Sequence, residues 1–367
     1  MPDFYIGLMS GTSMDGIDAV LVSFTESGLE LHATRVLPYP PALREALLSA
    51  IQEPLEVELD ESGKLDRQVG ECFRDAAVAL IESSGVDPVD VRAIGSHGQT
   101  IRHQPDAEPP FSLQIGDPKI ISTGTTIITI ANFRQADIAA GGQGAPLVPP
   151  FHEWLFRSEA INRVVINIGG IANITLLPAG EADVRGFDTG PGNGLMDTWI
   201  QQHRERPFDA SGQWAASGKV IGSLLSEFLA DPYFALPPPK STGFEYFNRH
   251  WLQQFDTERQ KPVDVQATLC ELTARTISKA ISTHTCGVSE FFVCGGGVHN
   301  TDLMNRLRRH NPNTVVAGTS AVGLDPDWVE AVAFAWLAMR TLHGETGNLP
   351  SVTGASHKVV LGELHCP

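Results

Sequence analysis

Glycines, hydroxyl residues and two carboxylates alternate in the segment 7–18, Gly-Leu-Met-Ser-Gly-Thr-Ser-Met-Asp-Gly-Ile-Asp. Glycine lets a phosphate approach main-chain N–H groups, and hydroxyls add further donors. Asp15 and Asp18 would repel a bare phosphate, but carboxylate oxygens suit a hydrated Mg²⁺ ion. The segment therefore predicts a phosphate-binding turn or an ordinary hairpin turn, and composition alone does not decide between them.

Two better-known phosphate loops do not fit this segment. Gly11 and Gly16 have the glycine spacing of a Walker-A loop, but Ile17 stands where that loop requires lysine. No GxGxxG pattern follows a predicted strand, so a Rossmann dinucleotide site has no support. The candidate nucleotide-binding residues of the segment are Gly11, Thr12, Ser13, Met14, Asp15, Gly16, Ile17 and Asp18.

Two further glycine turns follow predicted strands later in the chain. One lies at 169–170, with Asn173 just beyond it, and the other lies at 295–297, before a predicted helix. Glycines there suit an adenosine or its phosphates lying against the backbone and a helix N-terminus. Each turn alone is also typical of a plain connection, but three in this order favour a nucleotide site. The candidate residues are Gly169, Gly170, Asn173, Gly190, Gly295, Gly296 and Gly297.

Asp188 is the candidate general base. It follows a predicted strand at 184–187, and Pro191 and Gly192 then turn the chain toward a predicted helix. A carboxylate at a strand end beside a helix start tends to face a cleft. Partial desolvation there would raise its pKa toward the operating pH. The alternative is a helix-capping aspartate.

A third set of polar residues could hold sugar hydroxyls or an anionic group. Most of the set follows the predicted strand at 91–96, where a polar loop is the alternative. Arg134 lies in a stretch that either lines a ligand cleft or forms a hinge. Glu330 either complements a helix dipole or binds a sugar. The set comprises Ser96, His97, Gln99, Arg102, His103, Arg134 and Glu330.

Strands and helices must position these residues, and the apolar patterns predict both. Predicted strands run over 5–9, 17–24, 29–37, 91–96, 111–115, 125–130, 163–168, 171–177, 184–187, 291–294 and 314–317. Predicted helices run over 41–52, 64–83, 194–203, 301–310 and 327–342. The middle of the chain repeats the opening in order, with a strand, a glycine turn, two strands and then helices. The chain is therefore predicted to belong to the α/β class, with two similar lobes. The first lobe is expected over 1–130 with 345–367, and the second over 131–344.

Composition narrows the function classes. The chain has 367 residues, 42% hydrophobic, and a formal net charge of −17. This charge argues against a general nucleic-acid binder, which needs a basic surface. No signal peptide or apolar run long enough to cross a membrane is seen. The five cysteines lack metal-type spacing and are expected to be reduced thiols of a cytoplasmic protein.

With these motifs in place, the chain closely resembles the anhydro-N-acetylmuramic acid kinases. The matching segments are 7–18, 94–102, 141–149, 165–173, 186–197, 214–218, 240–243 and 294–297. They are spread over nearly the whole chain. Gly-Leu-Met-Ser-Gly-Thr-Ser-Met-Asp-Gly and Gly-Phe-Asp-Thr-Gly-Pro-Gly-Asn are specific strings.

The resemblance implies a two-lobed actin-like ATPase fold with ribonuclease H-like repeats, in which nucleotide and sugar bind between the lobes. It implies conversion of 1,6-anhydro-N-acetylmuramic acid, ATP and water into N-acetylmuramic acid 6-phosphate and ADP, in murein recycling. Asp188 would activate the water. Residues 11–18 would hold the phosphates, with Mg²⁺ at Asp18, and Arg102 or Arg134 would meet the lactyl carboxylate.

Two other functions stay open at this point. One is an ordinary sugar kinase, in which Asp188 deprotonates a free hydroxyl without opening a ring. The other is a non-catalytic nucleotide switch of the actin type, against which the polar loop at 96–103 argues. The oligomeric state is not decided, and a homodimer is one option.

Overall fold

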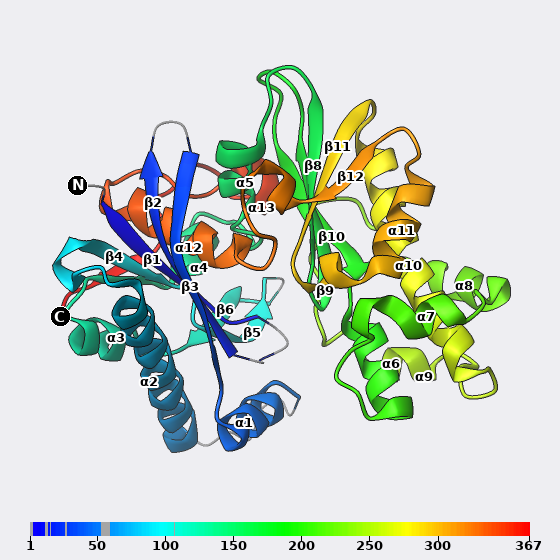
Figure 1. The fold of residues 1–367 in the computed structure, drawn as a ribbon, viewed down its shortest axis with the longest axis horizontal. Helices are drawn as coiled ribbons and strands as arrows, with labels where there is room; N and C mark the ends of the chain where they lie inside the picture. The colour runs from blue at the N-terminus through cyan, green and yellow to red at the C-terminus, as the bar shows by residue number, and fades with distance from the viewer. Residues whose placement is uncertain (1–2, 12–13, 15, 26–27, 53–58, 106) are drawn as a thin grey trace. The chain divides into compact units, whose positions relative to one another are not determined.

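The computed structural model describes residues 3–11, 14, 16–25, 28–52, 59–105 and 107–367. Thr12, Ser13 and Asp15 of the predicted phosphate turn lie outside the described residues. The chain forms two compact units: unit 1 is Met1–Phe151 with Trp328–Pro367, and unit 2 is His152–Asp327. Each unit has its own sheet and core, and Figure 1 gives the labels of their elements.

Unit 1 is built on a sheet of order β13-β7-β4-β1-β2-β3. Strands β3, β2 and β1 are antiparallel, whereas β4 lies parallel to β1, and β7 lies parallel to β4. The carboxyl ends of β1 and β4 therefore meet at one edge of the sheet. The sheet strands are β1 (Phe4–Met9), β2 (Gly16–Thr25), β3 (Gly28–Pro38), β4 (Val91–Ser96), β7 (Thr129–Ala131) and β13 (Glu363–His365). A separate hairpin joins β5 (Gln99–Gln104) to β6 (Phe111–Ile115).

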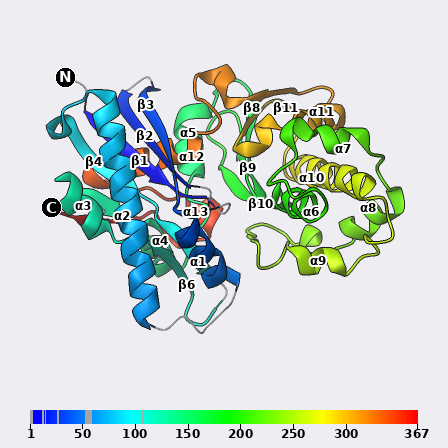
Figure 2. The same cartoon turned by 60° about the horizontal axis from the view of Figure 1, so that its bottom comes forward.

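Helix α2 (Leu59–Ser84) covers one face of this sheet (Figure 2). Its Val69 and Phe73 share a core with Ile6 and Ile94 of the strands. Burial of such side chains provides the main stabilisation of the unit. The other unit 1 helices are α1 (Pro41–Gln52), α3 (Pro118–Thr125), α4 (Phe133–Ala139), α12 (Val329–Leu342), α13 (Pro350–Thr353) and the 3₁₀ turn η1 (Pro88–Asp90).

Helix α12 lies directly on β1 and β4, and two glycines make this approach possible. A Cβ on Gly7 would stand 1.8 Å from the Ala331 carbonyl oxygen, and one on Gly95 would stand 2.1 Å from the Phe334 oxygen. No side chain fits in either space. Gly7 is therefore explained by helix packing and not by a phosphate.

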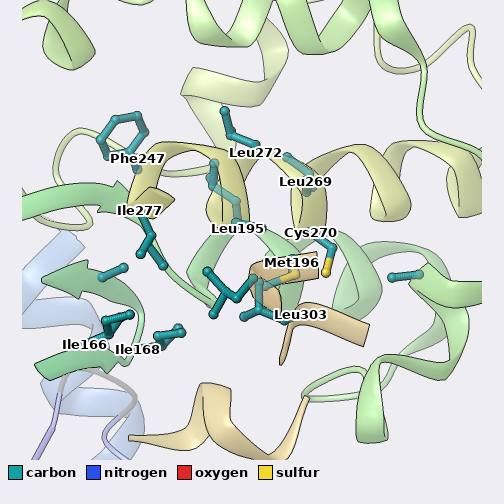
Figure 3. Close-up of a cluster of buried hydrophobic side chains, with 14 of the residues drawn as sticks. Ile166, Ile168, Leu195, Met196, Phe247, Leu269, Cys270, Leu272, Ile277 and Leu303 are labelled. Atoms are coloured by element: carbon teal, nitrogen blue, oxygen red, sulfur yellow. The ribbon is translucent and has the colours of Figure 1, made fainter. Parts of the chain in front are cut away.

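Unit 2 repeats the strand arrangement, with the order β10-β9-β8-β11-β12. Strands β10, β9 and β8 are antiparallel, and β11 lies parallel to both β8 and β12. The strands are β8 (Asn162–Ile168), β9 (Ile171–Leu177), β10 (Arg185–Pro191), β11 (Val288–Cys294) and β12 (Val315–Gly318). Its core gathers strand residues such as Ile166 against Leu269 and Leu272 of α10 and Leu303 of α11 (Figure 3).

The helices of unit 2 fall mainly between β10 and β11. They are α6 (Gly194–Arg204), α7 (Gln213–Ser217), α8 (Gly222–Leu229), α9 (Arg249–Gln253), α10 (Pro262–His284) and α11 (Thr301–His310). The 3₁₀ turns are η2 (Ala210–Gly212), η3 (Pro232–Ala235), η4 (Gly296–His299) and η5 (Thr319–Val322). Helix α5 (Pro149–Phe156) spans the division between the units.

The predicted α/β class and the repeated strand order are confirmed, but three local predictions are wrong. The predicted strand at 125–130 is the end of α3 followed by the short β7. Asp117 caps α3 by accepting a hydrogen bond from Lys119 N, and Pro118 starts it. The predicted polar loop at 96–103 instead enters β5, because β6 supplies a pairing partner. Asp188 lies within β10 and not after a strand.

The division into units differs from the expected lobes. Residues 131–151 and 328–344, expected in the second lobe, pack mostly in unit 1. The reason is the tertiary position of α12, which returns to β1 and β4 although it follows unit 2 in the sequence.

Candidate functional site

Ser10 holds the first glycine turn of unit 1 at the end of β1. Its hydroxyl lies 2.7 Å from Gln99 Oε1 and 3.0 Å from the Gly16 carbonyl oxygen. Gln99 Nε2 donates to the Gly11 carbonyl oxygen at 3.5 Å, and Met14 N donates to the same oxygen at 3.2 Å. Gln99, predicted to bind substrate, therefore braces the turn.

The predicted nucleotide residues of this turn differ in what they offer a ligand. The side chains of Met14 and Ile17 are buried in the core of unit 1, so only their main chains could meet a phosphate. A Cβ on Gly16 would stand 2.6 Å from the Leu37 carbonyl oxygen, so this glycine serves strand packing. At Gly11 no atom of the described residues beyond its chain neighbours lies within 4 Å of a Cβ position. Among the described residues, Gly11 therefore has open space beside its backbone.

Asp18 is the predicted magnesium ligand. It is half-buried in β2, opposite Met9 of β1 and Val36 of β3. Among the described residues, no three His, Cys, Asp or Glu side chains come together as a metal site. A single carboxylate fits Mg²⁺ bound to nucleotide phosphates, because this ion keeps several waters and takes one or two carboxylates.

His97, buried just after β4, pairs with the half-buried Arg134 of α4. An Arg134 terminal nitrogen lies 2.9 Å from His97 Nε2, and His97 Nδ1 lies 2.9 Å from the Gly98 carbonyl oxygen. Burial, with the Arg134 charge, lowers the pKa of His97 to about 3. His97 is therefore neutral, with Nδ1–H donating and Nε2 accepting. The other terminal nitrogen of Arg134 donates to the Gly144 carbonyl oxygen at 2.8 Å.

His103 lies near the same guanidinium. Its Nδ1 lies 3.1 Å from Ser112 Oγ, and burial with the Arg134 charge lowers its pKa to about 4. In the described part of the chain, the buried His103 Nε2 has no hydrogen-bond partner. His97, His103 and Arg134 therefore form one cluster of two imidazoles and a guanidinium, which suits a polar or anionic substrate group.

The remaining sugar candidates lie in different surroundings. Ser96 ends β4 with its hydroxyl buried. It lines a cavity of about 200 Å³ with His97 and Gln114. Arg102 donates to the Ile51 carbonyl oxygen at 2.6 Å, which ties it to the last turn of α1. Glu330 lies half-buried in the first turn of α12, where a carboxylate complements the helix dipole.

In unit 2, strand register assembles a polar row. Asp188 of β10 pairs with Asn173 of β9, and Asn173 pairs with Asn167 of β8. Directly opposite residues of adjacent strands share a face and have Cα atoms roughly 4.5–5.5 Å apart. The three polar side chains therefore lie in one line on one face of the sheet.

Asp188 is held at its backbone and its carboxylate. Its N–H donates to the Lys240 carbonyl oxygen at 3.1 Å, and its carbonyl oxygen accepts from the Tyr233 hydroxyl at 2.9 Å. Thr242 N donates to Asp188 Oδ2 at 2.9 Å. The carboxylate is half-buried and restrained in orientation, as a positioned proton acceptor must be.

The Asp188 charge also acts on its neighbours. Burial lowers the pKa of Lys240, and Asp188 opposes this shift. Burial, followed by the charge of Asp188, raises the pKa of Tyr233. Lys240 Nζ lies 4.5 Å from the centre of the Tyr233 ring and donates to the Tyr233 carbonyl oxygen at 3.1 Å. Tyr233, Lys240 and Thr242 were not predicted as site residues, because no local pattern shows that their segment returns to β10.

The second and third glycine turns converge in unit 2. The carbonyl oxygens of Gly169 and Gly170 accept from the N–H groups at 192–194, at 2.8–3.0 Å. A Cβ on Gly297 would stand 2.4 Å from the Ile168 Cβ, so the 295–297 turn packs on the end of β8. Gly296 lies near Asn193, whose Nδ2 donates to the Ile168 carbonyl oxygen at 3.2 Å.

Gly190 lies in β10, close to Asp188. Its φ is 136°, and a Cβ there would stand 2.6 Å from the Phe234 ring. A bulge in β10 lies between Asp188 and Gly190. Gly190 is therefore explained by backbone conformation and packing near Asp188.

Comparisons with known proteins show the family of the chain. The family model for anhydro-N-acetylmuramic acid kinase matches residues 3–367. The enzyme of that name from Shewanella halifaxensis is 51% identical, over 99% of this chain and 98% of its own. The one from Xanthomonas campestris pv. campestris (strain 8004) is 52% identical over 98% and 97%. The one from Coxiella burnetii (strain Dugway 5J108-111) is 48% identical over 98% and 97%.

Two solved structures with a similar fold are distant in sequence. A ROK family glucokinase from Streptomyces griseus, in complex with glucose and AMPPNP, is 14% identical with a TM-score of 0.42, over 92% of this chain and 99% of its own. The activator of the 2-hydroxyisocaproyl-CoA dehydratase from Clostridium difficile, with bound ADPNP, is 12% identical with a TM-score of 0.46, over 91% and 94%. Within the described ranges, every helix is too short or too polar to cross a membrane. By its full-length match and its relatives at about half identity, the chain belongs to the anhydro-N-acetylmuramic acid kinase family.

Proposed function

We propose that this chain converts 1,6-anhydro-N-acetylmuramic acid, ATP and water into N-acetylmuramic acid 6-phosphate and ADP. The observation that carries the proposal is the family match over residues 3–367, with relatives of that name about half identical over nearly their whole length. The proposed setting is murein recycling in the cytoplasm, in keeping with five free cysteines.

Asp188 is proposed to activate the water. Its carboxylate takes one proton as the water oxygen attacks C1 of the sugar. The C1–O6 bond breaks, and O6 takes the γ-phosphoryl group of ATP. The amide of Thr242 and the packing around Tyr233 support this role, because they restrain the carboxylate while leaving it half-buried. A base held in this way contributes roughly 10²–10⁴-fold to a rate.

The glycine turns are proposed to hold the nucleotide. Open backbone at Gly11 fits a phosphate oxygen, and a Cβ at Gly169 would meet only the Ile171 carbonyl oxygen, at 3.7 Å. Asp18 is the proposed protein ligand of Mg²⁺, which neutralises phosphate charge when bound. The 295–297 turn, packed on Ile168, is proposed to hold the adenosine side.

The cluster of His97, His103 and Arg134 is proposed to bind the sugar. Arg134 is favoured over Arg102 for the lactyl carboxylate, because two further polar side chains, His97 and His103, lie close to its guanidinium. Neutral His97 fixes one Arg134 nitrogen, so the guanidinium is oriented before the substrate arrives.

Two measurements test the proposal. ADP release should require 1,6-anhydro-N-acetylmuramic acid, and neither free N-acetylmuramic acid nor glucose should replace it. A reaction in ¹⁸O-water should place the label at C1 of the product. Phosphorylation without label at C1 would indicate an ordinary sugar kinase. ADP release that no sugar stimulates would indicate a nucleotide switch.

A further inference from the structure

Asn167 carries a buried side-chain acceptor in β8. It is the last residue but one of β8, and it is 8% exposed. Among the described residues, its Oδ1 has no hydrogen-bond partner. Buried polar atoms in folded proteins nearly always have a partner, because losing water without replacement costs free energy. A donor from outside the chain would remove this cost.

The backbone of a glycine lies directly against this oxygen. A Cβ on Gly295 would stand 2.4 Å from Asn167 Oδ1, so any side chain at this position would clash with the oxygen. Gly295 has a φ of 74°, and its N–H donates to the Pro326 carbonyl oxygen at 3.0 Å. The glycine backbone is therefore fixed in place beside the oxygen, and its own N–H is engaged elsewhere and does not serve Oδ1.

Nearby donors within the chain are already engaged. Asn193 Nδ2 donates to the Ile168 carbonyl oxygen, and the Asn193 N–H donates to the Gly169 carbonyl oxygen. The N–H groups of Gly192 and Gly194 both donate to the Gly170 carbonyl oxygen. These four donors therefore do not serve Asn167 Oδ1.

The strand register shows which ligand would meet Asn167. On one side it pairs with Asn173, which pairs in turn with Asp188. On the other side it pairs with Cys294, directly before the 295–297 turn. Asn167 therefore lies between the proposed catalytic carboxylate and the turn proposed to hold adenosine.

We propose that Asn167 is a nucleotide-binding residue whose Oδ1 accepts a hydrogen bond from an O–H group brought by the nucleotide. Two sources carry that chemistry, a ribose hydroxyl and a water of the nucleotide's hydrated Mg²⁺. The inference rests on the proposed function, because it takes a nucleotide as the ligand of these turns.

The test is direct binding of ADP with Mg²⁺, measured by calorimetry on the full chain. Asn167→Leu keeps the branched shape and removes the acceptor, so the ADP dissociation constant should rise roughly three- to tenfold, as expected for one hydrogen bond. Asn167→Asp keeps an acceptor there and should bind ADP more tightly than Asn167→Leu. Equal ADP affinity in wild type and Asn167→Leu would overturn the inference.

Asn162→Leu is the matched control at the other end of β8. Asn162 accepts from Ala179 N at 2.8 Å and donates to the Cys286 carbonyl oxygen at 3.0 Å. Its replacement should lower the melting temperature without changing ADP affinity. A similar loss of ADP affinity in both variants would mean that Asn167 acts only through stability, which overturns the inference.

Two arms separate the sources of the O–H group. If it is a ribose hydroxyl, 2′,3′-dideoxy-ADP should bind wild type and Asn167→Leu equally. If it is a metal-bound water, the difference should vanish for ADP in EDTA. A difference in affinity between wild type and Asn167→Leu that persists both with 2′,3′-dideoxy-ADP and in EDTA would contradict an O–H donor. Wild type that binds no ADP would refute the proposed function itself, whereas normal ADP binding and release without an Asn167 effect would refute only this inference.

Discussion

The two units share a strand order but differ in one row of side chains. In both, three antiparallel strands are followed by parallel ones, as β3-β2-β1-β4-β7 in unit 1 and β10-β9-β8-β11-β12 in unit 2. The row that crosses the first three strands, just before the glycine turn, is Val36, Asp18 and Met9 in unit 1. The matching row in unit 2 is Asp188, Asn173 and Asn167.

This difference shows how one architecture can serve two purposes. The unit 1 row has a single carboxylate between two apolar residues, which suits a metal held mainly by phosphates and water. The unit 2 row is polar throughout, and its carboxylate is oriented by Thr242 N. Equivalent backbone positions thus present different chemistry, and the side chains decide the role of each unit.

The largest expected effect lies at the end of the unit 2 row. Asp188→Asn keeps the shape and removes the proton acceptor, so we expect kcat to fall roughly 10²–10⁴-fold. ADP affinity should stay unchanged, because the turns are not altered. Steady-state ADP release and calorimetry measure the two quantities. Asp183→Asn, at an exposed aspartate just before β10, is the control. Near-normal turnover in Asp188→Asn would mean that the carboxylate of the unit 2 row is not the general base.

A second experiment compares two glycines of unit 1. Gly7→Ala drives a methyl group into the Ala331 carbonyl, so we expect a loss of about 3 kcal/mol in the free energy of unfolding. Gly11→Ala meets open space and should change stability by less than about 0.5 kcal/mol, while weakening ATP binding. Chemical denaturation and ATP titration check both. Equal destabilisation by the two variants would contradict the assignment of Gly7 to packing.

A third experiment compares buried histidines in the two units. Burial lowers the pKa of His97 in unit 1, and of His152 in unit 2, to about 3 in the folded chain. The unfolded chain has the higher pKa of roughly 6.5 and binds more protons below it, so stability falls as pH drops from about 6.5 toward 3.

At pH 5, each histidine should cost roughly 2 kcal/mol relative to neutral pH. His97→Gln or His152→Gln should therefore flatten the pH dependence of the denaturation midpoint for the unit that carries it. If the denaturation midpoints of the variants changed with pH just as in wild type, these side chains would not titrate in this way.

The smallest expected effect concerns Asp18 in the unit 1 row. Asp18→Asn keeps an oxygen but loses its charge, so we expect about tenfold more Mg²⁺ for half-maximal activity. A magnesium titration of ADP release measures this. Glu30→Gln, at an exposed carboxylate of β3, should leave the titration unchanged. An identical Mg²⁺ titration for wild type and Asp18→Asn would mean that Asp18 does not bind the metal.

Local patterns predicted much of the fold, because apolar alternation and glycine turns are sequence features. The strands β1, β4, β8 and β9 lie close to where alternation predicted them. Prediction failed where a distant segment decides the outcome. Strand β5 forms because it pairs with β6, which begins seven residues after β5 ends. Helix α12 follows unit 2 in the sequence but belongs to unit 1.

The same distinction runs through the candidate site. Asp188, Asp18 and the glycine turns could be proposed from residue type and spacing. Arg102 was proposed for substrate, yet it donates to the Ile51 carbonyl oxygen. Asn167 was not predicted as a site residue, because only the fold shows that its oxygen lacks a partner within the described residues.

The sequence by itself determined the α/β class, the repeated order of strands and glycine turns, and the family to which the chain belongs. Residue type and local spacing are enough for these, because they set backbone preferences and recognisable motifs. Only the tertiary structure decided which glycines serve packing, as Gly7 does, and which present open backbone, as Gly11 does. It alone placed Asn167, Asn173 and Asp188 in one row, because register between strands depends on pairing across the whole sheet.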